Sequence, residues 1–93
     1  MAKAVVTIKI MPEDPSVDLH KVQAEAEHKI DHFCGEKGEK RHEIEPIAFG
    51  LKALKITFVM DESIGSTESL EQEIGKLAGV NSVEVVDVRR AIG

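Results

Sequence analysis

The chain has 93 residues, a mass of 10.2 kDa and a formal net charge of −5. This length is enough for one small hydrophobic core, so we expect a single domain over residues 1–93. Hydrophobic residues make up 42% and charged residues 31%, which is typical of a folded domain rather than a disordered one. The single cysteine excludes an intramolecular disulfide and indicates a reducing compartment.

The composition also excludes several classes of protein. The N-terminal segment MAKAVVTIKI lacks the long apolar region and cleavage site of a signal peptide, so we expect a cytoplasmic protein. No stretch approaches the roughly 18 apolar residues of a membrane-spanning helix. The acidic balance and the absence of Trp and Tyr argue against ordinary nucleic-acid binding. We therefore expect no direct contact with nucleic acid or membrane.

The first part of the chain predicts a strand and a helix. Residues 3–11 alternate between two sets of side chains, as in a half-buried strand. The segment DPSVD at 14–18 offers two aspartates and a serine as helix caps. Apolar residues then recur at every third or fourth position, which predicts an amphipathic helix over about residues 19–34. The segment CGEKGEK at 34–40 predicts a solvated loop.

The second part predicts a hairpin, a helix and a strand. Residues 41–60 alternate again and are interrupted at a Phe-Gly pair, which indicates a hairpin. Apolar residues at helical spacing follow and predict a second helix that ends at Gly79. Residues 82–88, SVEVVDV, predict a last strand, in which the adjacent Val85 and Val86 indicate a bulge.

This order of elements is typical of one fold. Strand, helix, strand, strand, helix, strand predicts an α+β, ferredoxin-like βαββαβ two-layer sandwich. We expect a four-stranded antiparallel sheet with two helices on one face and the other face open. Right-handed crossovers place the first and third strands in the centre of the sheet.

The charges are unevenly distributed. Residues 12–45 and 61–79, mostly helix and loop, carry 15 acidic and 6 basic residues, whereas the rest of the chain carries 2 acidic and 6 basic residues. The open sheet face is expected to present Lys3, Lys9 and Lys55 among valines and threonine, a surface suited to an acidic partner. Alternatively, these lysines only keep an exposed face soluble. The residues leave both interpretations open.

The predicted hairpin tip is unusual. Residues 46–51, PIAFGL, are uncharged where a turn is normally polar, and they place Phe49 before Gly50. In one interpretation Phe49 folds back over a sheet edge, with Gly50 as a bulge residue. In the other, Phe49 is an anchor for a pocket on a partner. Sequence alone does not choose between them.

Few other side chains suggest chemistry. Glu25, His28 and His32 share one face of the first predicted helix, where the histidines could bind zinc, but a solvated helix face is favoured. Cys34 is expected to pack, because no histidine is placed to activate it, and no catalytic residue is expected. No glycine-rich phosphate-binding motif is present, so we expect no binding of GTP or ATP by such a motif.

Two arginines near the C-terminus are the last candidates. Arg89 and Arg90 in VRRAIG are predicted to come directly after the last strand. They either solubilise the end of the chain or meet a phosphate or carboxylate with two hydrogen bonds.

The chain resembles the archaeal translation elongation factor 1-beta family in four segments: AVVTIKIMPEDPSVDL, EPIAFGLKALKITFVM, GVNSVEVVDV and RRAIG. These segments cover nearly the whole chain. Members of this family are guanine-nucleotide exchange factors of elongation factor 1-alpha. The resemblance implies a ferredoxin-like fold, GDP release and GTP loading on elongation factor 1-alpha during translation elongation, no cofactor of its own and no covalent catalysis. The implied partner is that GTPase in its GDP-bound and nucleotide-free forms.

The resemblance also implies site residues. In eukaryotic relatives an aromatic residue of the hairpin enters a pocket on the partner, and Phe49 matches it. A lysine next to the C-terminus of those relatives reaches toward the magnesium and phosphate region. This chain lacks that lysine and has Arg89 and Arg90 a few residues earlier. Together with Gly50 and Lys55, these residues make up the expected partner-binding site.

Two other functions fit the same topology. A strand of the form GV-x-SVEV also occurs in ACT-type domains, which leaves a small-ligand regulatory module as the alternative. An acylphosphatase-like hydrolase is disfavoured, because that enzyme needs an arginine after the first strand and MPEDP at 11–15 has none.

Overall fold

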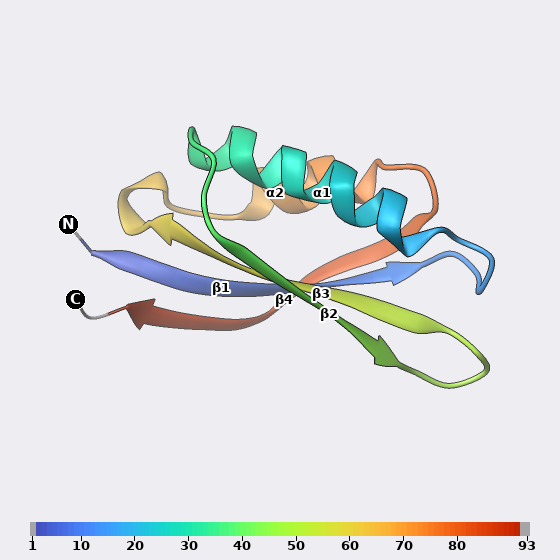
Figure 1. The fold of residues 1–93 in the computed structure, drawn as a ribbon. Helices are drawn as coiled ribbons and strands as arrows, with labels where there is room; N and C mark the ends of the chain where they lie inside the picture. Colours follow the sequence, from blue (N-terminus) through green and yellow to red (C-terminus); the bar gives the residue numbers. More distant parts are fainter. Residues whose placement is uncertain (1, 92–93) are drawn as a thin grey trace.

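The computed structural model describes residues 2–91 (Figure 1). It contains four strands, two α-helices and one turn of 3₁₀ helix in the order β1, α1, β2, β3, η1, α2 and β4. Their bounds are β1 Lys3–Pro12, α1 Leu19–Cys34, β2 Lys40–Pro46, β3 Lys52–Asp61, η1 Glu62–Ile64, α2 Glu68–Gly75 and β4 Val80–Ala91. The predicted ferredoxin-like order is confirmed.

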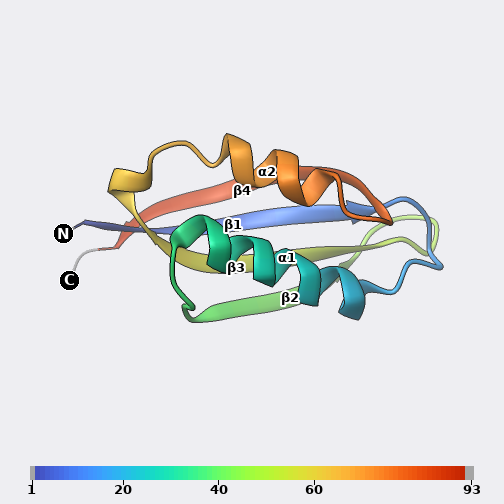
Figure 2. The same cartoon turned by 90° about the horizontal axis from the view of Figure 1, so that it is seen from above.

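The four strands form one antiparallel sheet in the order β2-β3-β1-β4. The first and third strands are therefore central, as the crossover rule predicts. Both helices lie on the same side of the sheet (Figure 1), with α1 over β2 and β3 and α2 over β1 and β4 (Figure 2). No helix of residues 2–91 covers the other face, which is the open face below.

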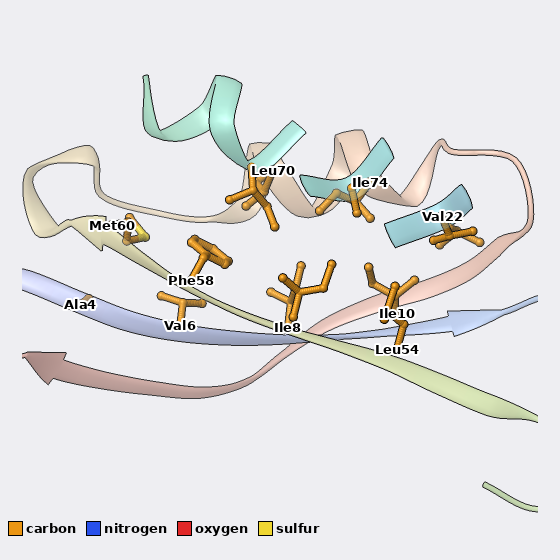
Figure 3. Close-up of a cluster of buried hydrophobic side chains, with 14 residues drawn as sticks. Ala4, Val6, Ile8, Ile10, Val22, Leu54, Phe58, Met60, Leu70 and Ile74 are labelled. Atoms are coloured by element: carbon orange, nitrogen blue, oxygen red, sulfur yellow. The ribbon is translucent and has the colours of Figure 1, made fainter. Parts of the chain in front are cut away.

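The core lies between the sheet and the helices. On β1 and β3, alternate residues point toward the helices (Figure 3), and each large apolar side chain buried there contributes about 1.5–3 kcal/mol. The buried apolar cluster consists of Ala4, Val6, Ile8, Ile10, Val22, Ala26, Ile30, Leu54, Ile56, Phe58, Met60, Leu70, Ile74 and Val80. The period-two pattern of both central strands thus predicted their inner faces correctly.

The first helix begins and ends at residues suited to those positions. The Asp18 carboxylate accepts hydrogen bonds from the backbone N–H groups of His20 and Lys21, at 3.0 and 3.4 Å. Such a cap satisfies N–H groups that have no partner within the helix. At the other end Gly35 adopts a left-handed conformation with φ 77°. The predicted helix is confirmed.

The second helix is shorter than predicted. It ends at Gly75, and the backbone N–H groups of Lys76 and Leu77 bond to carbonyl groups three residues back. These tighter bonds end the helix in a turn. Leu77 still packs against the core from this turn, which explains why its spacing resembled that of a helical residue. The prediction that Gly79 ends the helix is wrong.

The last strand is longer than predicted, because β4 continues through the two arginines to Ala91. Thr7 pairs with Asp87 and Ile8 pairs with Val85, so Val86 is an extra residue and the predicted bulge is confirmed. Arg89 and Arg90 lie within the strand rather than after it. Residues 92–93 of the RRAIG segment lie outside the described residues.

No helix within residues 2–91 combines the length and apolar character needed to cross a bilayer.

Candidate partner-binding site

The hairpin tip has an uncommon backbone. The Leu51 N–H donates to the Ala48 carbonyl at 3.1 Å, which closes a β-turn. Both central residues have positive φ angles, 59° for Phe49 and 77° for Gly50, as in a type I′ turn. Glycine adopts this conformation freely, but a bulky residue is strained by about 1–3 kcal/mol. Asparagine or glycine would be the ordinary residue at position 49.

The side chain of Phe49 points into solvent. It is 96% exposed, whereas Ile44 and Ile47 nearby are 40% and 37% exposed. The interpretation in which Phe49 folds back over a sheet edge is therefore wrong. An aromatic ring that is exposed to water on a strained turn does not stabilise this chain. Its position therefore indicates a contact with another molecule.

A groove of about 350 Å³ lies beside the tip. It is lined by Pro12, Pro15, Val17, Leu19, Ile44 and Gly50, with charged and polar groups from Asp14, Asp18, His20 and Lys52. The hairpin tip and the loop that follows β1 therefore form one continuous, partly apolar surface.

The two arginines near the C-terminus point to opposite faces of the sheet. Arg89 is paired with Val5 on the open face, where its Nε donates to Asp87 Oδ2 at 2.9 Å. Arg90 is paired with Ala4 on the helix side. There its Nε and Nη2 donate to the two carboxylate oxygens of Glu62 at 2.8 and 3.0 Å. The hydrogen bonds from Arg90 lower the pKa of the Glu62 carboxyl.

The hairpin tip and these arginines lie at opposite ends of the molecule. The hairpin projects from one end, and the start of β1 and the end of β4 lie together at the other (Figures 1 and 2). The molecule is 42 Å long and only 20 Å wide. A partner that touches both sites must therefore extend along most of this length.

The open face is not the basic surface that the sequence suggested. Glu45 on β2 reaches Lys55 at 2.7 Å and Lys9 at 3.7 Å. The hydrogen bond from Lys55 lowers the pKa of the Glu45 carboxyl. In addition, Glu43 lies opposite Lys55 and Glu84 lies opposite Lys9. Two of the three lysines that were expected to attract an acidic partner, Lys9 and Lys55, are therefore matched by carboxylates of the same face.

The remaining candidates from the sequence are the two histidines of α1 and Cys34. His28 and His32 line a groove of about 400 Å³ between the helices, together with Lys29 and Glu73. Within residues 2–91, no three side chains of the metal-binding types are gathered closely enough to hold an ion. Cys34 packs against the core, and burial raises the pKa of its thiol, which disfavours the reactive thiolate.

Sequence reasoning missed two residues of these sites. Glu45 was counted with the acidic helix-and-loop segments, although β2 brings it to the open face. Glu62 is 28 residues from Arg90 in the sequence, and no local spacing joins them. Strand register is the signal that could have joined Glu62 and Arg90. Lys3 of β1 pairs with Asp61 at the end of β3 and with Ala91 at the end of β4, and these are the sequence neighbours of Glu62 and Arg90.

Comparison with known proteins gives a consistent result. A family model described as the EF-1 guanine nucleotide exchange domain matches residues 5–91. The protein named Elongation factor 1-beta from Methanothermobacter thermautotrophicus is 42% identical over 92 residues. Its counterparts of the same name from Methanobrevibacter smithii and Staphylothermus marinus are 44% and 41% identical over 90 and 91 residues. Each comparison covers 97% of this chain and 98% of the relative.

Proposed function

Because this chain belongs to the EF-1 guanine nucleotide exchange domain family, we propose that it promotes GDP release from elongation factor 1-alpha and so allows GTP to bind. The observation that carries the proposal is the family match, which spans both the hairpin tip and the arginines of β4. Since translation elongation takes place in the cytoplasm, this activity is expected there.

The proposed activity needs no covalent step. Exchange replaces one bound nucleotide by another, so the factor only has to bind the nucleotide-free partner more tightly than the GDP-bound partner. By linkage, nucleotide then weakens binding of the factor by the same ratio. A thousandfold faster release of GDP corresponds to a barrier lower by about 4 kcal/mol. One aromatic anchor and one partly desolvated ionic contact are of this size.

Phe49 is the proposed anchor. Its ring is 96% exposed and stands at the tip of a turn whose positive φ angles point it away from the sheet. Burying such a ring in a pocket of the partner is the kind of contact that dominates protein interfaces. Gly50 supports the anchor because it adopts the second positive φ angle without strain. Lys55 supports it through the ion pair with Glu45 in the hairpin stem.

An arginine of β4 is the proposed polar contact. The side chains of Arg89 and Arg90 are 78% and 71% exposed, so a second anion can reach either of them. A guanidinium brought toward bound Mg²⁺ and phosphate repels the metal or competes with it for the phosphate. Since the two proposed sites lie at opposite ends of the molecule, the partner is held at one end while its nucleotide site is perturbed from the other.

Release of labelled GDP from purified elongation factor 1-alpha tests the proposal. We expect the rate to rise with the concentration of this chain and to reach a plateau at saturation. Excess unlabelled GTP prevents rebinding, and a sample of elongation factor 1-alpha alone gives the intrinsic rate. An unchanged release rate would contradict the proposal and would favour the alternative function, an ACT-like ligand-binding module.

A further inference from the structure

The backbone that carries the Glu62 carboxylate is held in place by hydrogen bonds. Its backbone N–H donates to the Ala2 carbonyl at 3.1 Å, and its own carbonyl accepts from the Gly65 N–H at 3.1 Å. The preceding residue, Asp61, caps the 3₁₀ turn by accepting from the Ser63 N–H at 2.9 Å. Both backbone groups of Glu62 are therefore fixed, and its side chain is 32% exposed.

Glu62 binds the Nε–Nη2 edge of the Arg90 guanidinium and leaves the end formed by the two Nη groups available. The hydrogen bonds use Nε and Nη2, so Nη1 is directed away from the carboxylate. A guanidinium has five N–H groups, and this pairing occupies two of them. Because the Arg90 side chain is 71% exposed, a second carboxylate or phosphate can bind the Nη1–Nη2 end while Glu62 keeps the Nε–Nη2 edge.

Arg89 is held less firmly. Its one side-chain hydrogen bond within residues 2–91 comes from Nε to Asp87, two positions earlier on the same strand. A single bond to a neighbour on an edge strand leaves the guanidinium free to rotate, whereas two bonds to a separate element fix its plane. Of the two arginines, Arg90 is the one with a fixed orientation.

We infer that Glu62 is a positioning residue for exchange, which holds Arg90 in the orientation that meets the partner's anionic group as nucleotide leaves. This inference rests on the function proposed above. Because Glu62 already orders the long Arg90 side chain, this side chain does not have to lose conformational entropy when the partner binds. The difference corresponds to about threefold to tenfold in the rate of GDP release. The effect belongs to the transition state for release, so it changes the rate at saturation more than the affinity.

The first test replaces Glu62 by glutamine, which keeps the size of the side chain and removes its charge. With E62Q we expect GDP release at saturating factor to slow by about threefold to tenfold, and affinity for the nucleotide-free partner to change by less than about twofold. The matched control is E68Q, the same charge change at the exposed start of α2. Thermal unfolding of both variants monitors the fold.

The second test uses the Arg90→Ala and Arg90→Lys backgrounds, because a lysine keeps the charge but cannot form the two-point contact. In both backgrounds E62Q should cause no further slowing, since Glu62 acts only through the Arg90 guanidinium. Faster release with E62Q would show that Glu62 sequesters Arg90, and equal slowing in the Arg90→Ala background would show an independent effect. Either result, or an unchanged rate with E62Q, overturns the inference. If the unaltered chain fails to accelerate release, the proposed function itself is wrong.

Discussion

A Cβ atom placed on Gly79 would lie 2.9 Å from Cγ1 of Val17. Gly79 also has a φ of 86°, and its carbonyl accepts the backbone N–H of Glu13 at 2.9 Å. The turn before β4 is thus fixed against the loop before α1. Both the close approach and the backbone conformation require glycine here.

Gly79→Ala should therefore lower the free energy of unfolding by about 1–3 kcal/mol, through backbone strain and overpacking against Val17. The matched control is Gly75→Ala, because Gly75 lies in α2 and a methyl group added to it would meet no atom within 4 Å. Alanine there should raise the stability by up to about 1 kcal/mol. Urea denaturation measures both changes, and equal effects of the same sign would contradict the assigned end of α2.

The hairpin tip predicts opposite effects on stability and on activity. Phe49→Asn should raise the free energy of unfolding by about 1 kcal/mol, because asparagine tolerates a positive φ angle better than phenylalanine. The same variant should slow GDP release at least about thirtyfold, which corresponds to the loss of about 2 kcal/mol from an aromatic anchor.

Two variants separate the ring from the turn. Phe49→Ala keeps the backbone strain and removes the ring, so it should lose exchange without the gain in stability. Val86→Ala is the control, since Val86 is also exposed but lies at the bulge of β4. A loss of folding with Phe49→Ala would show that the ring belongs to the core after all.

The sequence predicted well which residues of each helix and strand face the core, because this depends on a repeat of apolar residues within the element itself. The alternation of Leu54, Ile56, Phe58 and Met60 identifies the inner face of β3 without any knowledge of its neighbours. The charge of the open face depends instead on which strands lie side by side. Glu45 neutralises Lys9 from a strand that is two places away in the sheet. Such contacts are set by strand order and register, which spacing along the chain does not reveal.

Acid should destabilise the fold through its paired carboxylates. Hydrogen bonds from Lys55 lower the pKa of Glu45, and those from Arg90 lower the pKa of Glu62. A carboxyl whose pKa is lower in the folded state stabilises the fold fully above its ordinary unfolded pKa of about 4, and this contribution is lost as the pH falls through the folded pKa. Stability should therefore be level between about pH 5 and 7 and fall below about pH 4.

Glu45→Gln tests this explanation, because it removes the charge that Lys55 stabilises. The variant should be less stable than the parent at pH 7, and the two urea denaturation curves should converge once the pH falls below the lowered pKa of Glu45. Glu36→Gln, in the exposed loop before β2, is the control and should follow the parent at pH 7 and in acid. A constant difference between parent and Glu45→Gln across the range would exclude the ion pair as its cause.

The two arginines of β4 should differ in their importance for exchange. Arg90 is fixed by two hydrogen bonds to Glu62 on the helix side, whereas Arg89 has one bond to Asp87 on the open face. A fixed cation in a partly desolvated interface is worth a few kcal/mol to a developing ionic contact. Arg90→Ala should thus slow GDP release by about tenfold to a hundredfold, or about 1.4–2.8 kcal/mol, and Arg89→Ala by less than about threefold.

Point variants are a better test of this difference than truncation. Removal of residues 89–91 would also delete the pairing of β4 with Lys3, Ala4 and Val5, so a lost activity would not identify the charge as its cause. Reversal of a helix charge with Glu25→Lys controls for net charge, and it should leave release nearly unchanged because α1 lies over β2 and β3, whereas both arginines lie on β4 at the other edge of the sheet (Figure 2). A larger loss of GDP release rate with Arg89→Ala than with Arg90→Ala would place the polar contact on the open face. Equal release rates for Arg89→Ala, Arg90→Ala and Glu25→Lys would leave Phe49 as the main agent of exchange.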